Sequence, residues 1–89
     1  MFRYIILLSQ DPLSFISLGS DDFTPVYAGT IKAEDEEDAL NRLFCIFNRD
    51  YPPDYRGRSL SVGDRILLDG ERIMTYQIEP TGFTIVNSN

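Results

Sequence analysis

The alternation of hydrophobic and polar residues predicts two strands in the first third of the chain. Both alternating sets of positions from Phe2 to Ser9 are largely apolar, which is the pattern of a central strand covered on both faces of its sheet. Residues 10–23 follow neither a strand period nor a helix period and mix Asp, Pro, Ser and Gly with apolar residues, so we expect a partly ordered loop. The β-branched and aromatic residues of Val26–Lys32, which follow Pro25, predict the second strand.

The middle of the chain carries the clearest helical pattern. Five consecutive acidic residues at positions 34–38 open it, and we interpret them as a helix start rather than a metal site because carboxylates oppose the positive end of the helix dipole. Asn48 is predicted to end the helix, since two prolines follow. Cys45 is expected to be a small, half-buried hydrophobic residue on the flank of the apolar face. That face is predicted to consist of Ala39, Leu40, Leu43, Phe44 and Phe47.

Two further strands, Arg65–Leu68 and Arg72–Glu79, flank Asp69-Gly70, a pair of residues typical of hairpin turns. A two-residue turn there would divide the apolar side chains between the two faces of the sheet. A three-residue loop closed by Gly70 in the left-handed conformation would place four of them on one face, so we expect this longer loop. The four residues are Ile66, Met74, Tyr76 and Ile78.

With a last strand at Phe83–Asn87, the order of elements predicts an α+β fold. We expect a single small domain over residues 1–89, with a mostly antiparallel sheet of about five strands covered by one helix. A chain of this length builds one thin core and has little room for an enclosed active-site cavity. The edges of such a sheet, residues 24–32 or the last strand, are where a homodimer could form.

Charge and cysteine content narrow the classes of partner. The chain has 14 acidic and 8 basic residues, a net charge of -6, which disfavours nucleic acid as a partner. The imbalance lies in residues 1–54, which hold 10 acidic and 4 basic residues, whereas residues 55–89 hold 4 of each. Cys45, the single cysteine, cannot form an internal disulfide, and the N-terminal apolar run is too short for a signal peptide or a membrane span. We therefore expect a cytoplasmic protein without membrane contact.

The segment from Asn48 to Asp64 carries the most candidate binding chemistry. Its tyrosines offer amphipathic contact area, its prolines stiffen it, its arginines can bind a carboxylate or phosphate, and Gly57 lets a backbone approach a partner. In the alternative interpretation, the tyrosines cap the core, the arginines pair with acidic residues of the helix, and Gly63 and Asp64 form a tight turn. The candidate binding surface consists of Asn48, Tyr51, Asp54, Tyr55, Arg56, Gly57, Arg58, Ser59, Gly63 and Asp64.

These residues bring a family resemblance. Phe47-Asn48, the run from Pro53 to Asp64 and the closing Gly82-Phe83 resemble the YodL-like domain, over about residues 24–86. The family comprises small bacterial proteins often carried on plasmids and conjugative elements, and it often has His where Arg58 stands here. The resemblance implies an accessory protein linked to the maintenance of mobile elements or to defence evasion, and it implies no reaction.

Enzymatic chemistry has little support in the residues themselves. The chain has no His to activate a Ser or Cys nucleophile, no glycine-rich phosphate loop and no Cys or His metal spacing. Asp54 and Asp64 remain as a carboxylate pair, but aspartates are common in turns. We therefore expect no enzyme, no catalytic or metal-binding residues and no cofactor.

Three binding hypotheses stay open. We favour a protein-interaction module with an unidentified protein partner, because tyrosine and arginine beside prolines are typical of binding hot spots. A small nucleic-acid-binding domain is the first alternative, since the turn at Val62-Gly63-Asp64 is similar to turns in the PUA and ASCH superfamily. The second is an acidic DNA mimic built on the first half of the chain. The arginines that motivate the nucleic-acid alternative are Arg56, Arg58, Arg65 and Arg72.

Overall fold

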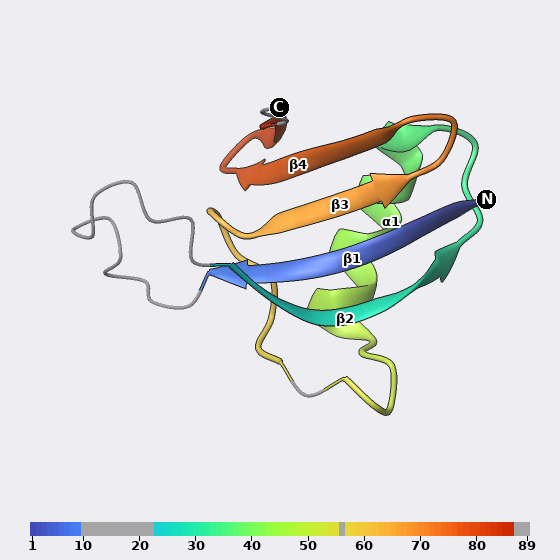
Figure 1. The fold of residues 1–89 in the computed structure, drawn as a ribbon. Coiled ribbons are helices and arrows are strands. Elements are labelled where there is room, and N and C mark those ends of the chain that lie inside the picture. The colour runs from blue at the N-terminus through green and yellow to red at the C-terminus, as the bar shows by residue number, and fades with distance from the viewer. Residues whose placement is uncertain (10–22, 56, 87–89) are drawn as a thin grey trace.

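The computed structural model describes residues 1–9, 23–55 and 57–86 (Figure 1). Within these ranges the chain forms five strands and one helix in the predicted order, which confirms the α+β class. The elements are β1 Phe2–Ser9, β2 Phe23–Ile31, α1 Glu36–Arg49, β3 Arg65–Asp69, β4 Ile73–Glu79 and β5 Gly82–Ile85. The loop expected at residues 10–23 lies, apart from its last residue, outside the described residues.

The strands form one sheet in the order β2-β1-β3-β4-β5, and every neighbouring pair is antiparallel. β1 is therefore an inner strand, with a neighbour on each side, and α1 lies behind one face of the sheet in Figure 1. Tyr4, Ile6 and Leu8 of β1 are buried on this face. The expectation that β1 is covered on both faces is wrong for the described residues, because Ile5 and Leu7 on the opposite face are only half-buried.

β2 forms one edge of the sheet and begins at Phe23, three residues before the predicted strand. Pro25 lies inside it, and the register with β1 shifts at this point, between Ile6 and Leu7. An edge strand tolerates proline because one side of its backbone has no ladder partner that needs the missing N–H. The sequence pattern missed this extension because Pro25 is typical of a strand start.

β5 forms the other edge and is shorter than predicted, since it ends at Ile85 instead of Asn87. Gly82 begins it with a φ of 151°, a conformation that favours glycine. The two segments expected at the edges of the sheet are thus confirmed as edges. Pairing of either edge with a second copy stays a prediction.

α1 begins where the acidic run predicts a helix start. Asp35 is the N-cap, and its side chain accepts a hydrogen bond of 2.8 Å from the backbone N–H of Asp38. The carboxylates of the first turn lie at the positive end of the helix dipole, so the interpretation of the acidic run as a helix start is confirmed. The helix ends at Arg49, one residue beyond the predicted end.

The predicted apolar face of α1 is confirmed for four residues and wrong for Phe44, which is 36% exposed and packs edge to face on Phe83 of β5. Cys45 is exposed instead of half-buried. Successive helical residues turn by about 100°, which places Phe44 at the flank and Cys45 on the side away from the sheet. The buried residues of α1 are Ala39, Leu40, Leu43 and Phe47.

Within the described residues, no helix has the length and apolar composition to span a membrane.

The hairpin between β3 and β4 has a three-residue loop, as predicted, but the loop is residues 70–72, so Gly70 begins it instead of closing it. Asp69 lies opposite Ile73, and Ile66 lies opposite Tyr76. Ile66, Met74, Tyr76 and Ile78 therefore share the face that packs on α1, as predicted, whereas Leu67 lies on the opposite face. The predicted left-handed conformation of Gly70 is wrong, because Gly70 does not have a positive φ. Glycine is needed there for close packing instead, since a Cβ would lie 2.6 Å from the ring of Phe2.

An aromatic cluster joins the sheet, the helix and the segment after the helix. Phe47 is fully buried at its centre, and its ring centroid lies 6.0 Å from that of Tyr4, 5.4 Å from Tyr27 and 4.8 Å from Tyr55. All three contacts are edge-to-face, a favoured arrangement of aromatic rings. Because Tyr55 belongs to the connection between α1 and β3, this cluster attaches that connection to the core.

Candidate functional site

Residues 50–64, which connect α1 to β3, contain nearly all the candidate binding residues and no helix or strand among those described. Tyr55 anchors the first half of this 50–64 loop: it is 9% exposed, and its Oη donates a hydrogen bond of 2.7 Å to the carbonyl oxygen of Arg58. Tyr51 stacks on Tyr55 with a centroid distance of 5.5 Å. The first half of the loop is therefore positioned by aromatic packing against Phe47.

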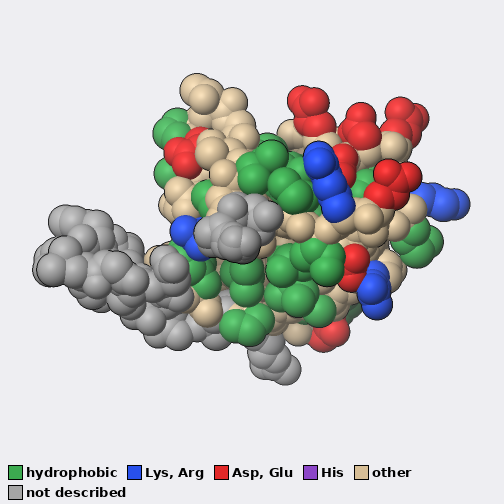
Figure 2. Space-filling view, turned by 45° about the horizontal axis from the view of Figure 1, so that its top comes forward, with side chains coloured by type: hydrophobic (Ala, Val, Ile, Leu, Met, Phe, Trp, Pro, Cys, Tyr) green, Lys and Arg blue, Asp and Glu red, His purple; other side chains and the backbone are tan. Residues whose placement is uncertain are grey.

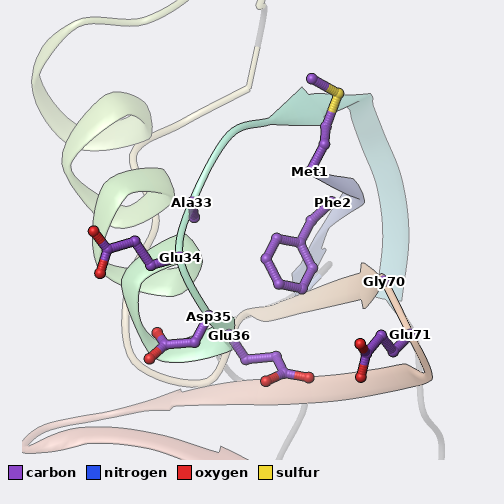
Figure 3. Close-up of a pocket in the computed structure, with 8 residues that line it drawn as sticks. All are labelled: Met1, Phe2, Ala33, Glu34, Asp35, Glu36, Gly70 and Glu71. Carbon is purple, nitrogen blue, oxygen red and sulfur yellow. The ribbon is translucent and has the colours of Figure 1, made fainter.

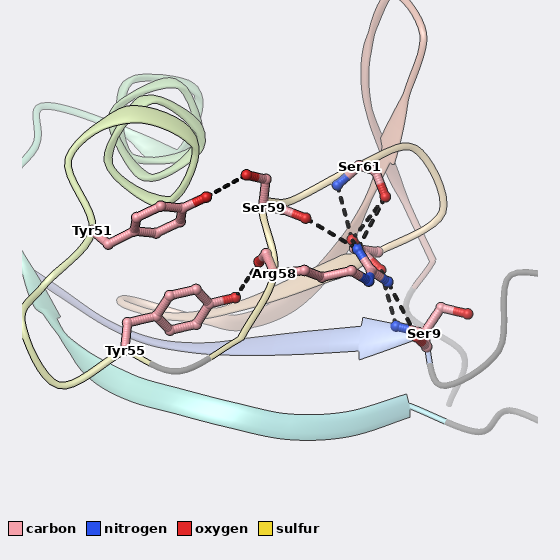
Figure 4. Close-up of polar contacts among 7 residues, drawn as sticks. Ser9, Tyr51, Tyr55, Arg58, Ser59 and Ser61 are labelled. Carbon is pink, nitrogen blue, oxygen red and sulfur yellow. Dashed lines mark hydrogen bonds and ion pairs between the residues drawn. The ribbon is translucent and has the colours of Figure 1, made fainter.

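Asp64 anchors the second half of the loop through its bonds to Arg58, Ser9 and Ser61, which are labelled in Figure 4. It is fully buried, and its carboxylate accepts two hydrogen bonds from the Arg58 guanidinium, at 2.6 Å to Oδ2 and 2.8 Å to Oδ1. It also accepts the backbone N–H of Ser61 at 2.8 Å and that of Ser9 at 2.9 Å. Two-point, charge-assisted bonds of this kind are strong and directional. Because Ser9 ends β1, the carboxylate ties the loop to this inner strand of the sheet.

Arg58 completes the network. Its Nη2 donates to the carbonyl oxygen of Ser9 at 3.1 Å, and its Nη1 donates to the carbonyl oxygen of Ser59 and to Ser61 Oγ, both at 3.1 Å. The alternative interpretation, in which the arginines of the loop pair with acidic residues of the helix, is wrong for Arg58. Its partner is Asp64, because the loop folds back on its own end. Arg56 lies outside the described residues.

The same bonds set the ionisation of the pair. Burial raises the pKa of Asp64, but the hydrogen bonds from Arg58 and from the N–H groups of Ser9 and Ser61 outweigh it and hold this pKa below its usual range. The hydrogen bond to Asp64 raises the pKa of Arg58 above its usual value. Both groups are therefore charged at neutral pH, and Asp64 acts as an anchor instead of a proton donor.

This lowered pKa predicts an acid-dependent loss of stability. The unfolded chain binds the Asp64 proton at about pH 4, whereas the folded chain binds it only at lower pH, so stability rises with pH between the two values. We expect the carboxylate's contribution in full above about pH 5 and its loss as pH falls through the folded pKa. Urea unfolding of the wild type and of Asp64→Asn from pH 7 to pH 3 checks this. Their difference in unfolding free energy should shrink at low pH, and a constant difference would contradict the lowered pKa.

Two glycines shape the loop from inside. Gly63 has a φ of 99°, and the N–H of Asp64 donates to the carbonyl oxygen of Ser61 at 3.0 Å, which confirms the predicted tight turn. A Cβ at Gly57 would lie 2.5 Å from Tyr55 Oη, so Gly57 permits close packing within the chain. The approach of a partner backbone at Gly57 stays a prediction.

The part of the loop that reaches solvent is smaller than the predicted surface. Tyr51 is 43% exposed, and a hydrogen bond joins its Oη to Ser59 Oγ. Asp54 is exposed, and its Oδ1 accepts a hydrogen bond of 2.9 Å from Tyr27 Oη. Val62 is 58% exposed at the turn. Sequence reasoning did not include Val62 in the binding surface. The signal that could have identified it is an apolar residue beside a glycine turn, outside any pattern that faces the core.

Three residues of the predicted binding surface are less accessible to a partner than we expected. Tyr55 and Asp64 are buried, and Asn48 is half-buried in α1. Asp54 and Asp64 have different partners, Tyr27 for the first and Arg58 for the second. The structure thus gives the two carboxylates no shared role.

The arginines after the loop are also engaged within the chain. The Arg65 guanidinium lies 4.2 Å from the centroid of the Phe23 ring, and its Nε donates to Gln77 Oε1 at 3.1 Å. Arg72 Nε lies 3.8 Å from a carboxylate oxygen of Glu36. These contacts do not favour the nucleic-acid alternative, which needs the guanidinium groups for phosphates.

A separate hollow of about 550 Å³ lies beside the start of α1 (Figure 3). The Phe2 ring forms part of its wall, and Glu34 and Asp35 point away from that ring. Within the described residues, no three acidic or cysteine side chains converge as metal ligands would. The carboxylates that line this hollow therefore make it negatively charged, but the described ones do not form a metal site.

Comparisons with known proteins find the same family that the loop residues resemble, the YodL-like domain. A family model described as YodL-like domain matches residues 3–88, farther toward the N-terminus than the resemblance at residues 24–86. A curated protein of Bacillus subtilis (strain 168), named Uncharacterized protein YodL, is 36% identical over 69 residues. The aligned part covers 73% of this chain and 66% of that relative, slightly less than two thirds of its length. No solved structure matches the chain.

Proposed function

The chain belongs to the YodL-like domain family, and from this premise we propose that it is a non-catalytic protein-interaction module that binds its partner through the 50–64 loop. The observation that carries the proposal is the internal fixation of this loop. A loop with no regular secondary structure among its described residues is held by a fully buried carboxylate and a buried tyrosine, while Tyr51 and Val62 stay exposed.

Fixation matters because binding costs entropy. A loop that is already ordered loses little conformational freedom when a partner docks, so more of the contact energy remains as affinity. Tyr51 is held by its stacking on Tyr55 and by its bond to Ser59, and it presents a rigid aromatic face. Tyrosine is enriched among residues whose truncation costs binding energy. Residues of the surface we propose are Tyr51, Pro53, Asp54, Arg58, Ser59 and Val62.

The chemistry of the loop favours a protein over a substrate. Its one buried acid, Asp64, is neutralised by Arg58, and the chain contains no His. We further propose an accessory role in the bacterial cytoplasm, for which the single cysteine and the link to mobile elements that the resemblance implies are the support.

A pull-down from lysate of the encoding bacterium, with and without nuclease, tests the function. The variant Tyr51→Ala/Val62→Ala removes two exposed side chains of the loop and leaves the Asp64 network in place. We expect it to lower recovery of the partner protein at least about tenfold, since hot-spot truncations each cost more than about 1 kcal/mol. The recovery should be the same in both nuclease arms.

The matched control is Phe44→Ala/Ile85→Ala, which truncates one aromatic and one β-branched residue that are 36% and 50% exposed elsewhere on the surface. This control should retain the partner. Equal recovery with the loop variant and the wild type would overturn the proposal. Recovery of RNA or DNA, with proteins lost after nuclease treatment, would instead support the nucleic-acid alternative.

A further inference from the structure

The face of the sheet that is turned away from α1 is apolar at its centre. Ile5 of β1 and Leu67 of β3 are register partners there, and Leu7 lies beside them. These side chains are only half-buried, and no element among the described residues packs on them. A shallow hollow of about 440 Å³ includes Ile5 and Leu67 in its lining. In Figure 2, hydrophobic side chains form a continuous group in the lower centre of the view, with charged side chains beside it.

This pattern differs from that of a solvated sheet face. An antiparallel sheet with one face in water alternates apolar residues toward the core with polar residues toward solvent. Here the outward positions Ile5, Leu7 and Leu67 are as apolar as their inward neighbours. The sequence therefore has the composition of a sheet packed on both faces, although α1 covers only one of them.

The charges around this apolar centre balance one another. At one end of the strands Arg3 and Asp69 form an ion pair of 2.6 Å. At the other end Arg65 binds Gln77, whose Nε2 donates to Glu79 at 3.1 Å. Among the described residues the face thus carries two basic and two acidic side chains, whereas the whole chain has a net charge of -6. A strongly charged partner would gain little here, and two copies of the chain could meet without net repulsion.

We infer that this face is the interface of a homodimer, in which the sheets of two copies pack face to face. The outward positions of β3 read Arg65, Leu67, Asp69, a charge of each sign at equal distance from an apolar centre. Consider a two-fold axis that lies midway between the two sheets, runs perpendicular to the strands and passes at Leu67. This axis places Leu67 over Leu67 of the other copy, and Arg65 of each copy over Asp69 of the other. Such self-complementarity is what an isologous interface requires. Sheets packed in this way interdigitate their side chains at a spacing of about 10 Å.

This inference does not rest on the proposed function, because the 50–64 loop contributes none of these side chains. It also differs from pairing through an edge of the sheet, which would join β2 or β5 strands by backbone hydrogen bonds. The two kinds of dimer respond differently to substitutions on the outward face of β3.

Sedimentation velocity across a range of protein concentrations tests the interface. The wild type should be a dimer, and Leu67→Glu should raise the dissociation constant at least about 100-fold, because it buries a charge at the centre. Ile85→Glu, at a 50% exposed apolar position outside this face, is the matched control and should remain dimeric. Circular dichroism of each variant shows whether it is folded.

A charge exchange separates interface contacts from folding. Arg65→Asp makes both charged positions of β3 acidic, and Asp69→Arg makes both basic, so each variant alone should be monomeric. An equimolar mixture should restore the dimer, because every acidic position then faces a basic one. A wild type that is monomeric at all concentrations would overturn the inference. So would a dimer that persists in Leu67→Glu, since that result indicates edge pairing, and so would folded Arg65→Asp and Asp69→Arg variants that fail to associate when mixed.

Discussion

Replacing Asp64 by Asn is expected to lower the free energy of unfolding by about 3 kcal/mol, the lower end of the range for removing one partner of a buried ion pair. The lower end applies because the side chain of Arg58 is 44% exposed and water can partly solvate it after the substitution. Asn keeps the shape of Asp64 but loses the charge that accepts four hydrogen bonds from Arg58, Ser9 and the Ser61 N–H. The amide also turns an NH₂ group toward one of these donors, which leaves both groups unsatisfied.

Urea unfolding at pH 7 and fixed protein concentration measures this loss through the shift in midpoint at unchanged slope. Glu36→Gln is the matched control, because Glu36 also pairs with an arginine, at 3.8 Å, but that arginine, Arg72, is 67% exposed and the pair lies outside both the 50–64 loop and the proposed dimer face. The control should cost less than about 1 kcal/mol, as exposed ion pairs do. Equal costs for the two substitutions would mean that the buried network contributes no more than a surface pair.

Phe47→Ala is expected to cost more still, about 3–5 kcal/mol, as for other buried phenylalanines. Phe47 is fully buried and touches the rings of Tyr4, Tyr27 and Tyr55. Truncation would therefore leave a cavity at the point where the sheet, the helix and the 50–64 loop meet. A domain of this size has a total stability on the order of 5–10 kcal/mol, so the variant should be close to unfolding at 37 °C.

Thermal unfolding followed by circular dichroism measures the effect of Phe47→Ala, and Phe44→Ala is its control on the same helix. Phe44 is 36% exposed and lies within packing distance of one ring, that of Phe83, so its loss should be clearly smaller. If the two substitutions lowered the midpoint equally, the aromatic cluster would not be the centre of the core. Phe47→Leu should recover part of the stability, since it fills more of the cavity.

The sequence predicted the location of the candidate site, but not which of its side chains are exposed or which of them pair with one another. The tyrosines, prolines and arginines of residues 50–64 marked this segment because their side-chain chemistry is visible in the sequence. The sequence left open whether Tyr55 caps the core or faces a partner, and it did not show that Asp64 turns inward, since exposure depends on which surface the loop folds against. It also could not show that Arg58 pairs with Asp64, because acidic residues stand on both sides of it in the chain. The revised surface therefore keeps Tyr51 and gains Val62.

The sequence by itself determined the order and type of the elements, the helix start at the acidic run and which apolar residues of the β3–β4 hairpin share a face. These features depend on residues near one another in the chain, so period, capping and turn length are enough to predict them. Only the tertiary structure decided that α1 covers a single face, that Gly70 serves packing on Phe2, and that Asp64 binds Ser9 across 55 residues of sequence. Such contacts form between segments that meet only when the sheet is assembled, and no local pattern encodes which partner a buried carboxylate or an uncovered face will find.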